Sequence, residues 1–89
     1  METHILFYEY VDDILERRGP FRESHLERIR AARDRGEVTL AGAVGNPPHG
    51  AAIVFQGAAP ERIEAFARED PYVEAGLVAD WRIEPWKLV

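Results

Sequence analysis

The 89-residue sequence predicts an α+β fold whose elements follow the order strand, helix, strand, strand, helix, strand. Two observations lead to this prediction. Four short segments are rich in β-branched and aromatic residues, and two segments that begin with proline carry apolar residues at helical spacing. Right-handed crossovers would place both helices on one face of a four-stranded antiparallel sheet, which is the ferredoxin-like arrangement.

The first half of the chain should form a strand and a long helix. The segment His4–Val11, HILFYEYV, is apolar or aromatic on both of its alternating faces, which is typical of a central strand. A short helical turn could follow at Asp12–Arg18. The long helix should begin at Pro20 and run to about Arg35, because Gly36 can adopt the left-handed conformation that commonly follows a helix.

The second half should form a hairpin, a helix and a final strand. Glu37–Val44 and Ala51–Gln56 are strand-like and are separated by the turn sequence GNPPHG. The second helix should begin at Pro60 and end near Asp70, since a residue that precedes proline is disfavoured in a helix. Apolar and polar residues alternate in the final segment LVADWRIEPW, as in a half-buried strand.

Size and composition limit the possible functions. A chain of this length can bury one core, so we expect a single domain over residues 1–89. The net charge is -5 and the basic residues are scattered among acidic ones, which argues against binding to nucleic acid. There is no cysteine, so disulfides and thiolate chemistry are excluded. The N-terminal METHILFYEYVDD has the pattern of neither a signal peptide nor a membrane span, so a cytoplasmic location is expected.

A histidine occupies an unusual position in the first helix. One apolar stripe of that helix would contain Phe21, His25, Ile29 and Ala32. His25 could be a buried imidazole that bonds a backbone carbonyl, or it could be a functional residue. Antiparallel helices would bring Asp70 near His25, although Asp70 precedes a proline and could simply cap the next turn.

Other chemistries are not supported by the sequence. His4, His25 and His49 lack the spacing of metal ligands, so no metal site is expected. The glycines of GAVGNPPHG lead into a strand rather than a helix, which argues against a phosphate-binding loop, and we expect no cofactor. Ser24 adjoins His25, but neighbours in a helix point about 100° apart and do not form a nucleophile–base pair.

One face of the sheet would remain without helices. The first strand is apolar on both sides, so leaving that face wet would expose an apolar patch. A second copy of the chain is the simplest cover. We therefore expect a homodimer that forms through the helix-free face and closes a barrel of two sheets, with polar residues such as Arg82 at its margins.

Four segments together resemble the YciI-like family. RESHLERI, AGAV, EDPYVEAGL and RIEPWKLV occur in the family's order over nearly the whole chain. The resemblance implies a dimeric α-β barrel, related in fold to muconolactone isomerases, and a functional His–Asp pair that corresponds to His25 and Asp70. Arg22 matches an arginine that often precedes this histidine, and Gly42 falls at the family's small-residue strand position. A dehydrochlorinase-type lyase is among the relatives, whereas the activity of most members is unassigned.

These observations predict a His/Asp acid–base site. Asp70 would fix the tautomer of His25, which would move a proton on a small cyclic or aromatic oxygenated substrate. Elimination or isomerisation of this kind needs no cofactor, so a lyase or isomerase is expected. The candidate pocket residues are Arg22, Ser24, Gly42 and Tyr72, although Arg22 could also be a solvated helix-edge charge and Tyr72 a core or interface residue. The alternative is a non-catalytic module that binds a small ligand or another protein.

Overall fold

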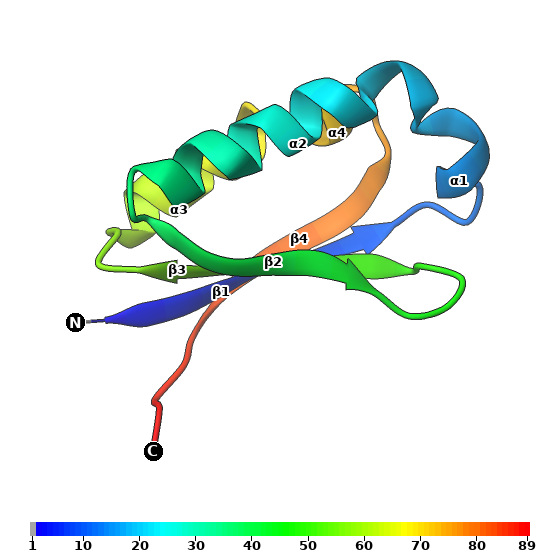
Figure 1. Ribbon diagram of the computed structural model, residues 1–89. Coiled ribbons are helices and arrows are strands. Elements are labelled where there is room, and N and C mark those ends of the chain that lie inside the picture. The colour runs from blue at the N-terminus through cyan, green and yellow to red at the C-terminus, as the bar shows by residue number, and fades with distance from the viewer. Residues whose placement is uncertain (1) are drawn as a thin grey trace.

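The computed structural model describes residues 2–89 and has the predicted βαββαβ order, with two short helices, one of which lies within the predicted helical turn at Asp12–Arg18 (Figure 1). The strands are β1 (Thr3–Tyr10), β2 (Val38–Val44), β3 (Gly50–Gln56) and β4 (Val78–Pro85). The long helices are α2 (Gly19–Asp34) and α3 (Pro60–Arg68), and the short ones are α1 (Ile14–Arg17) and α4 (Pro71–Glu74). The predicted boundaries lie within about two residues of these.

The four strands form one antiparallel sheet in the order β2-β3-β1-β4. Strand β1 lies inside the sheet, where Tyr8 is opposite Ala51 of β3 on one side and Trp81 of β4 on the other. Helices α2, α3 and α4 cover the same face of this sheet (Figure 1). The predicted two-layer, ferredoxin-like arrangement is therefore confirmed.

Proline and glycine determine where the helices begin and end. Pro20, Pro60 and Pro71 each occupy one of the first two positions of a helix. Gly36 follows α2 with a φ of 80°, a left-handed conformation that glycine adopts at little cost. Asp70 is extended, with φ -69° and ψ 128°, because it precedes a proline, so the chain bends between α3 and α4 at this residue. No helix in residues 2–89 is long and apolar enough to cross a membrane.

The hydrophobic core lies between the helices and the sheet. Leu6 of β1 and Ile53 of β3 are paired in the sheet and fully buried, and Ile63 and Ala67 of α3 pack in the same cluster. Burial of a large apolar side chain of this kind stabilises the fold by about 1.5 to 3 kcal/mol. The core therefore holds β1 firmly beneath the helices.

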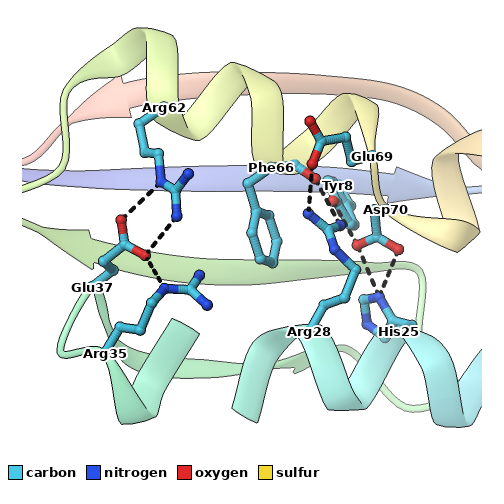
Figure 2. A network of polar contacts seen from close by, with 9 residues as sticks. All are labelled: Tyr8, His25, Arg28, Arg35, Glu37, Arg62, Phe66, Glu69 and Asp70. Atoms are coloured by element: carbon cyan, nitrogen blue, oxygen red, sulfur yellow. Dashed lines mark hydrogen bonds and ion pairs between the residues drawn. The ribbon is translucent and has the colours of Figure 1, made fainter. Parts of the chain in front are cut away.

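Polar contacts fasten α3 at both ends (Figure 2). Near the start of α3, Arg62 donates to Glu37 at 2.9 Å, and Arg35 donates to the same carboxylate at 2.7 Å. Near the end of α3, Arg28 of α2 donates to the backbone carbonyl of Phe66 at 2.9 Å. The second contact holds the C-terminal end of α3 beside the N-terminal half of α2.

The opposite face of the sheet carries no helix in the described part of the chain (Figure 1). On that face Ile5 and Phe7 are only half-buried, and Leu40 is 66% exposed. The guanidinium of Arg82 lies 4.4 Å from the centre of the Phe7 ring. Strand β1 thus presents apolar side chains to both sides, as predicted, but helices cover one side alone. A second copy of the chain as the cover of this face stays a prediction.

Candidate active site

His25 of α2 and Asp70, which caps α4, point toward each other and are in direct contact (Figure 2). The imidazole Nδ1 lies 2.9 Å from both Oδ1 and Oδ2 of Asp70. His25 is 4% exposed and Asp70 is fully buried. The imidazole therefore bonds a carboxylate, and not the backbone carbonyl that a purely structural histidine was expected to bond.

Helix geometry brings the two residues together. The predicted stripe of α2 faces the core, with His25, Ile29 and Ala32 buried and Phe21 half-buried. Asp70 follows α3 at the bend before α4. Because α2 and α3 run antiparallel, this bend lies beside the N-terminal half of α2, where His25 is.

Asp70 is a helix cap and a histidine partner at once. Its Oδ1 accepts a hydrogen bond from the backbone N–H of Tyr72 at 2.9 Å, which caps α4. Its Oδ2 accepts a hydrogen bond from the hydroxyl of Tyr8 at 2.8 Å. The two interpretations of Asp70 from the sequence are therefore compatible, since a carboxylate has enough lone pairs for all three partners.

Tyr8 is a site residue whose aromatic side chain suggested a core or interface position, and its contact with Asp70 was not predicted. Its hydroxyl comes from the middle of β1 and reaches Asp70 across 62 positions of sequence. Burial raises the pKa of Tyr8 well above its ordinary value, and the negative charge of Asp70 raises it further. Tyr8 therefore stays protonated near neutral pH and acts as a hydrogen-bond donor. Its inward position, alternating with Leu6 and Tyr10, was the available signal, but the alternation does not reveal the partner.

The carboxylate assigns the tautomer of His25. An ionised carboxylate only accepts hydrogen bonds, so Nδ1 carries the proton that lies between the two groups. Nε2 is then unprotonated in the neutral ring. It has no protein hydrogen-bond partner among residues 2–89, and it is not among the buried side-chain atoms that are sealed from solvent without a partner. Nε2 is therefore free to accept a proton from a bound molecule.

A tyrosine ring fixes the plane of the imidazole. The rings of His25 and Tyr72 are stacked, with centroids 3.9 Å apart and 7° between their planes. The rings of Tyr10 and Tyr72 pack edge to face, with 6.0 Å between their centroids. Burial raises the pKa of Tyr72, so its ring stays neutral and apolar against the imidazole. His25 is thus held by a carboxylate at Nδ1 and by an aromatic face.

A cavity of about 260 Å³ opens beside His25, between α2 and strands β2 and β3. Of the predicted pocket residues, Arg22, Gly42 and Tyr72 line it together with His25. Asp70 does not line the cavity and lies behind the imidazole. Ser24 is exposed on α2 and is not among the lining residues. Arg18, Arg30 and Arg33 also line the cavity and were not predicted as pocket residues.

No group of three or more His, Cys, Asp or Glu side chains in residues 2–89 is arranged to hold a metal ion. The groups that the cavity offers for chemistry are an imidazole, phenol hydroxyls and guanidiniums. Such groups can bind a substrate, polarise its bonds and transfer protons to or from it.

Comparison with known proteins identifies the family. The sequence matches the YCII-related domain over residues 1–87. The chain belongs to the YCII-related domain family. Protein YciI of Escherichia coli O6:H1 is 30% identical over 95 residues, and an uncharacterized protein of Haemophilus influenzae has the same identity, each comparison covering 97% of both chains. The resemblance of this YCII-related chain to the YciI-like family is therefore confirmed.

A solved structure has the same fold. The 5-chloro-2-hydroxyhydroquinone dehydrochlorinase TftG of Burkholderia phenoliruptrix AC1100, in complex with 2,5-dihydroxybenzoquinone, superposes with a TM-score of 0.81. The match covers 98% of the YCII-related chain and 95% of TftG, with 17% sequence identity. At this identity the likeness shows a common fold.

Proposed function

We propose that this YCII-related protein is a cofactor-independent acid–base enzyme of the lyase or isomerase type, acting in the cytoplasm on a small cyclic or aromatic oxygenated compound. The observation that carries the proposal is the contact of His25 Nδ1 with both oxygens of Asp70, at 2.9 Å, beside a cavity. This contact leaves Nε2 as the proton acceptor. A histidine held in this way is the usual form of a general base.

The proposed reaction begins with transfer of a substrate C–H or O–H proton to Nε2 of His25. The imidazole becomes a cation, and the buried carboxylate of Asp70 stabilises that charge without taking the proton. The electron pair left on the substrate then either expels a leaving group, which is an elimination, or shifts along the molecule. In an isomerisation the imidazolium returns the proton at another atom, and after an elimination it releases the proton to water. Tyr8 and the backbone N–H of Tyr72 hold Asp70 in place throughout.

The size of the cavity supports a small substrate. An apolar protein cavity of about 150 Å³ holds benzene. A cavity of about 260 Å³ can therefore take one substituted ring. TftG is a dehydrochlorinase of a chlorinated hydroxyhydroquinone, and its structure is a complex with a dihydroxybenzoquinone. The common fold makes oxygenated rings of this size the first compounds to test.

Turnover assays with a matched control test the proposal. Purified protein would be incubated with chlorinated hydroxyhydroquinones and with small lactones, and chloride release or isomer formation would be followed. His25→Gln should lower the rate by about 10² to 10⁴-fold, the usual contribution of a general base. Glu27→Gln, an exposed change on the same helix, should leave the rate unchanged. Turnover that is equal in wild type and His25→Gln would contradict the proposal.

The same assay examines the alternative function. A compound that binds in the cavity and is never turned over would favour a non-catalytic small-ligand-binding module. In that case the free Nε2 of His25 would serve as a hydrogen-bond acceptor for the ligand.

We also propose that the protein is a single domain over residues 1–89 that forms a homodimer through the helix-free face of the sheet. The match to the YCII-related domain over residues 1–87 supports the first part. The homodimer is supported by the exposed Leu40 and the half-buried Ile5 and Phe7, since the surface of a monomeric protein seldom carries such a group of apolar side chains in water.

A further inference from the structure

The cavity beside His25 has a strongly positive lining. Four arginines contribute to it: Arg18, Arg22, Arg30 and Arg33. No Asp or Glu is among the described residues that line it. This concentration of positive charge runs against the net charge of -5 of the whole chain. The cavity therefore differs in sign from the average surface of the protein.

The arginines come from α2 and from the residue that immediately precedes it. Arg18, Arg22 and Arg33 are spaced by four and eleven residues, and His25 and Ile29 lie between them along the same side. The facing wall is formed by the small residues at positions 41–43 of β2. Side chains this small leave room for the long arginine side chains and for a ligand between the two walls.

Three of the four arginines have no acidic partner. Arg30 donates to Glu23 at 3.0 Å, so its charge is partly neutralised at the surface. Arg18, Arg22 and Arg33 form no side-chain hydrogen bond or ion pair with any residue in 2–89. Most other arginines of the chain do have such partners: Arg17, Arg28, Arg35, Arg62 and Arg82. Unpaired guanidiniums thus gather at the cavity.

Their field reaches the inner wall of the cavity. Burial raises the pKa of Tyr10 to about 12, whereas Arg18 and Arg22 act in the opposite direction on the same hydroxyl. The same two arginines oppose the effect of burial on Tyr72. Both tyrosines line the cavity. A ligand that lies against these rings is therefore within the field of the guanidiniums.

We propose, resting on the function proposed above for His25, that the cavity takes its substrate as an anion, a small organic molecule whose carboxylate or ionised phenolic oxygen is held by Arg22 with Arg18 and Arg33. The unpaired guanidiniums supply charge-assisted hydrogen bonds to an oxyanion. The rest of the molecule would lie against Tyr72 with a proton near Nε2 of His25. The same positive charges would stabilise the negative charge that develops when that proton is removed.

A pair of probes that differ in charge tests the proposal. Benzoate and benzamide have rings of the same size, and benzoate alone is an anion at neutral pH. Each would be titrated into isotope-labelled protein while the NMR signals of His25 and Tyr72 are followed. Benzoate should shift these signals in a saturable manner, at least about tenfold more tightly than benzamide. Raising the salt concentration should weaken the binding of benzoate and leave the binding of benzamide unchanged.

Arginine variants with a matched control locate the effect. Arg22→Gln and Arg33→Gln should each lower the affinity for benzoate by about tenfold, the loss expected for a charge-assisted hydrogen bond. Arg17→Gln makes the same change of charge on α1 and does not line the cavity, so it should have no effect. Circular dichroism would establish that each variant is folded. 2,5-Dihydroxybenzoquinone, whose ring hydroxyls ionise, would replace benzoate in a parallel series. Tighter binding of that compound would assign the oxyanion to ring oxygens, and tighter binding of benzoate would assign it to a carboxylate.

The outcomes separate this proposal from that of the function. Equal affinity for benzoate and benzamide, no binding of either anion, or unchanged affinity in both arginine variants would overturn the anion site. Turnover that depends on His25 would still stand in those cases. Conversely, His25→Gln should retain benzoate binding. Charge-dependent binding by a wild-type protein that turns over no compound would support the anion site and contradict the proposed enzymatic function.

Discussion

His25 and Asp70, 45 positions apart in the sequence, meet with the imidazole Nδ1 2.9 Å from each carboxylate oxygen. Both side chains are buried. Removing His25 would leave the fully buried carboxylate of Asp70 without this partner, which is costly. The pair therefore contributes to the stability of the fold as well as to the proposed chemistry, and the two contributions have to be measured separately.

Two substitutions of His25 separate its roles. His25→Leu removes the donor to Asp70 and should lower the free energy of unfolding by about 3 to 5 kcal/mol. His25→Gln keeps an N–H that can reach the carboxylate, so it should cost clearly less. Both variants should lower the turnover rate by about 10² to 10⁴-fold, because neither has an imidazole. Urea unfolding and the turnover assay would be run on both, and equal stability of the two variants would show that the contact with Asp70 is not a stabilising one.

Tyr8→Phe tests the support of Asp70. This change removes one hydrogen bond to a fully buried carboxylate and should lower the free energy of unfolding by about 1 to 3 kcal/mol. Tyr72→Phe is the control, since it keeps the ring that stacks on His25 and its hydroxyl makes no hydrogen bond to Asp70. Chemical denaturation would compare the two. A loss for Tyr8→Phe no larger than that for Tyr72→Phe would count against this role of Tyr8.

The ion pairs of Glu37 predict a dependence of stability on pH. Hydrogen bonds from Arg62 and then Arg35 lower the pKa of Glu37 from 4.5 to about 2. A carboxyl group whose pKa is lowered by folding stabilises the protein above the pKa of the unfolded chain, and this contribution is lost as the pH falls through the folded value. The advantage of wild type over Glu37→Gln should therefore be full above about pH 5 and vanish toward about pH 2.

The stability difference between wild type and Glu37→Gln should be modest. Arg62 is 56% exposed, so solvent screening keeps the contribution of the ion pair small. Urea unfolding of both proteins at several pH values, at low and high salt, would measure it. A difference between the two proteins that is constant over this pH range would contradict the assignment to Glu37.

The helix-free face predicts the oligomeric state. We expect light scattering to give the mass of a dimer at micromolar concentration. Leu40→Glu places a charge in the exposed part of this face and should give a folded monomer. Leu15→Glu on α1, where the leucine is also exposed, should remain a dimer. A monomeric wild type, or a dimer that Leu40→Glu does not affect, would refute a dimer through this face.

The sequence predicted the elements better than the contacts between them. The prolines at helix starts, the segment HILFYEYV with two apolar faces and the alternation in LVADWRIEPW were sufficient to predict the fold, because these signals are local. His25 and Asp70 could be placed near each other because antiparallel helices leave few alternatives. Tyr8 could not be assigned to Asp70, since strand alternation does not reveal which residue lies above it.

The arginines illustrate the same limit. The helical phase puts Arg18, Arg22 and Arg33 along one side of α2, and this could have been read from the sequence. Whether that side faces water or a cavity depends on what lies across from it. The small residues at positions 41–43 provide the space, and their position opposite α2 follows from sheet order, which is a long-range property.

The most direct test of the central claim, that Asp70 holds His25 with Nε2 free toward the cavity, is an imidazole nitrogen NMR measurement on wild type and Asp70→Asn at a pH where His25 is neutral. Asparagine caps a helix nearly as well as aspartate, so α4 should persist in the variant. In wild type the proton should reside on Nδ1, and Nε2 should show the signal of an unprotonated nitrogen. In Asp70→Asn the amide can donate as well as accept, so the preference for the Nδ1–H tautomer should weaken or reverse. An Nε2–H tautomer in wild type, or an equally strong preference for the Nδ1–H tautomer in both proteins, would contradict the account.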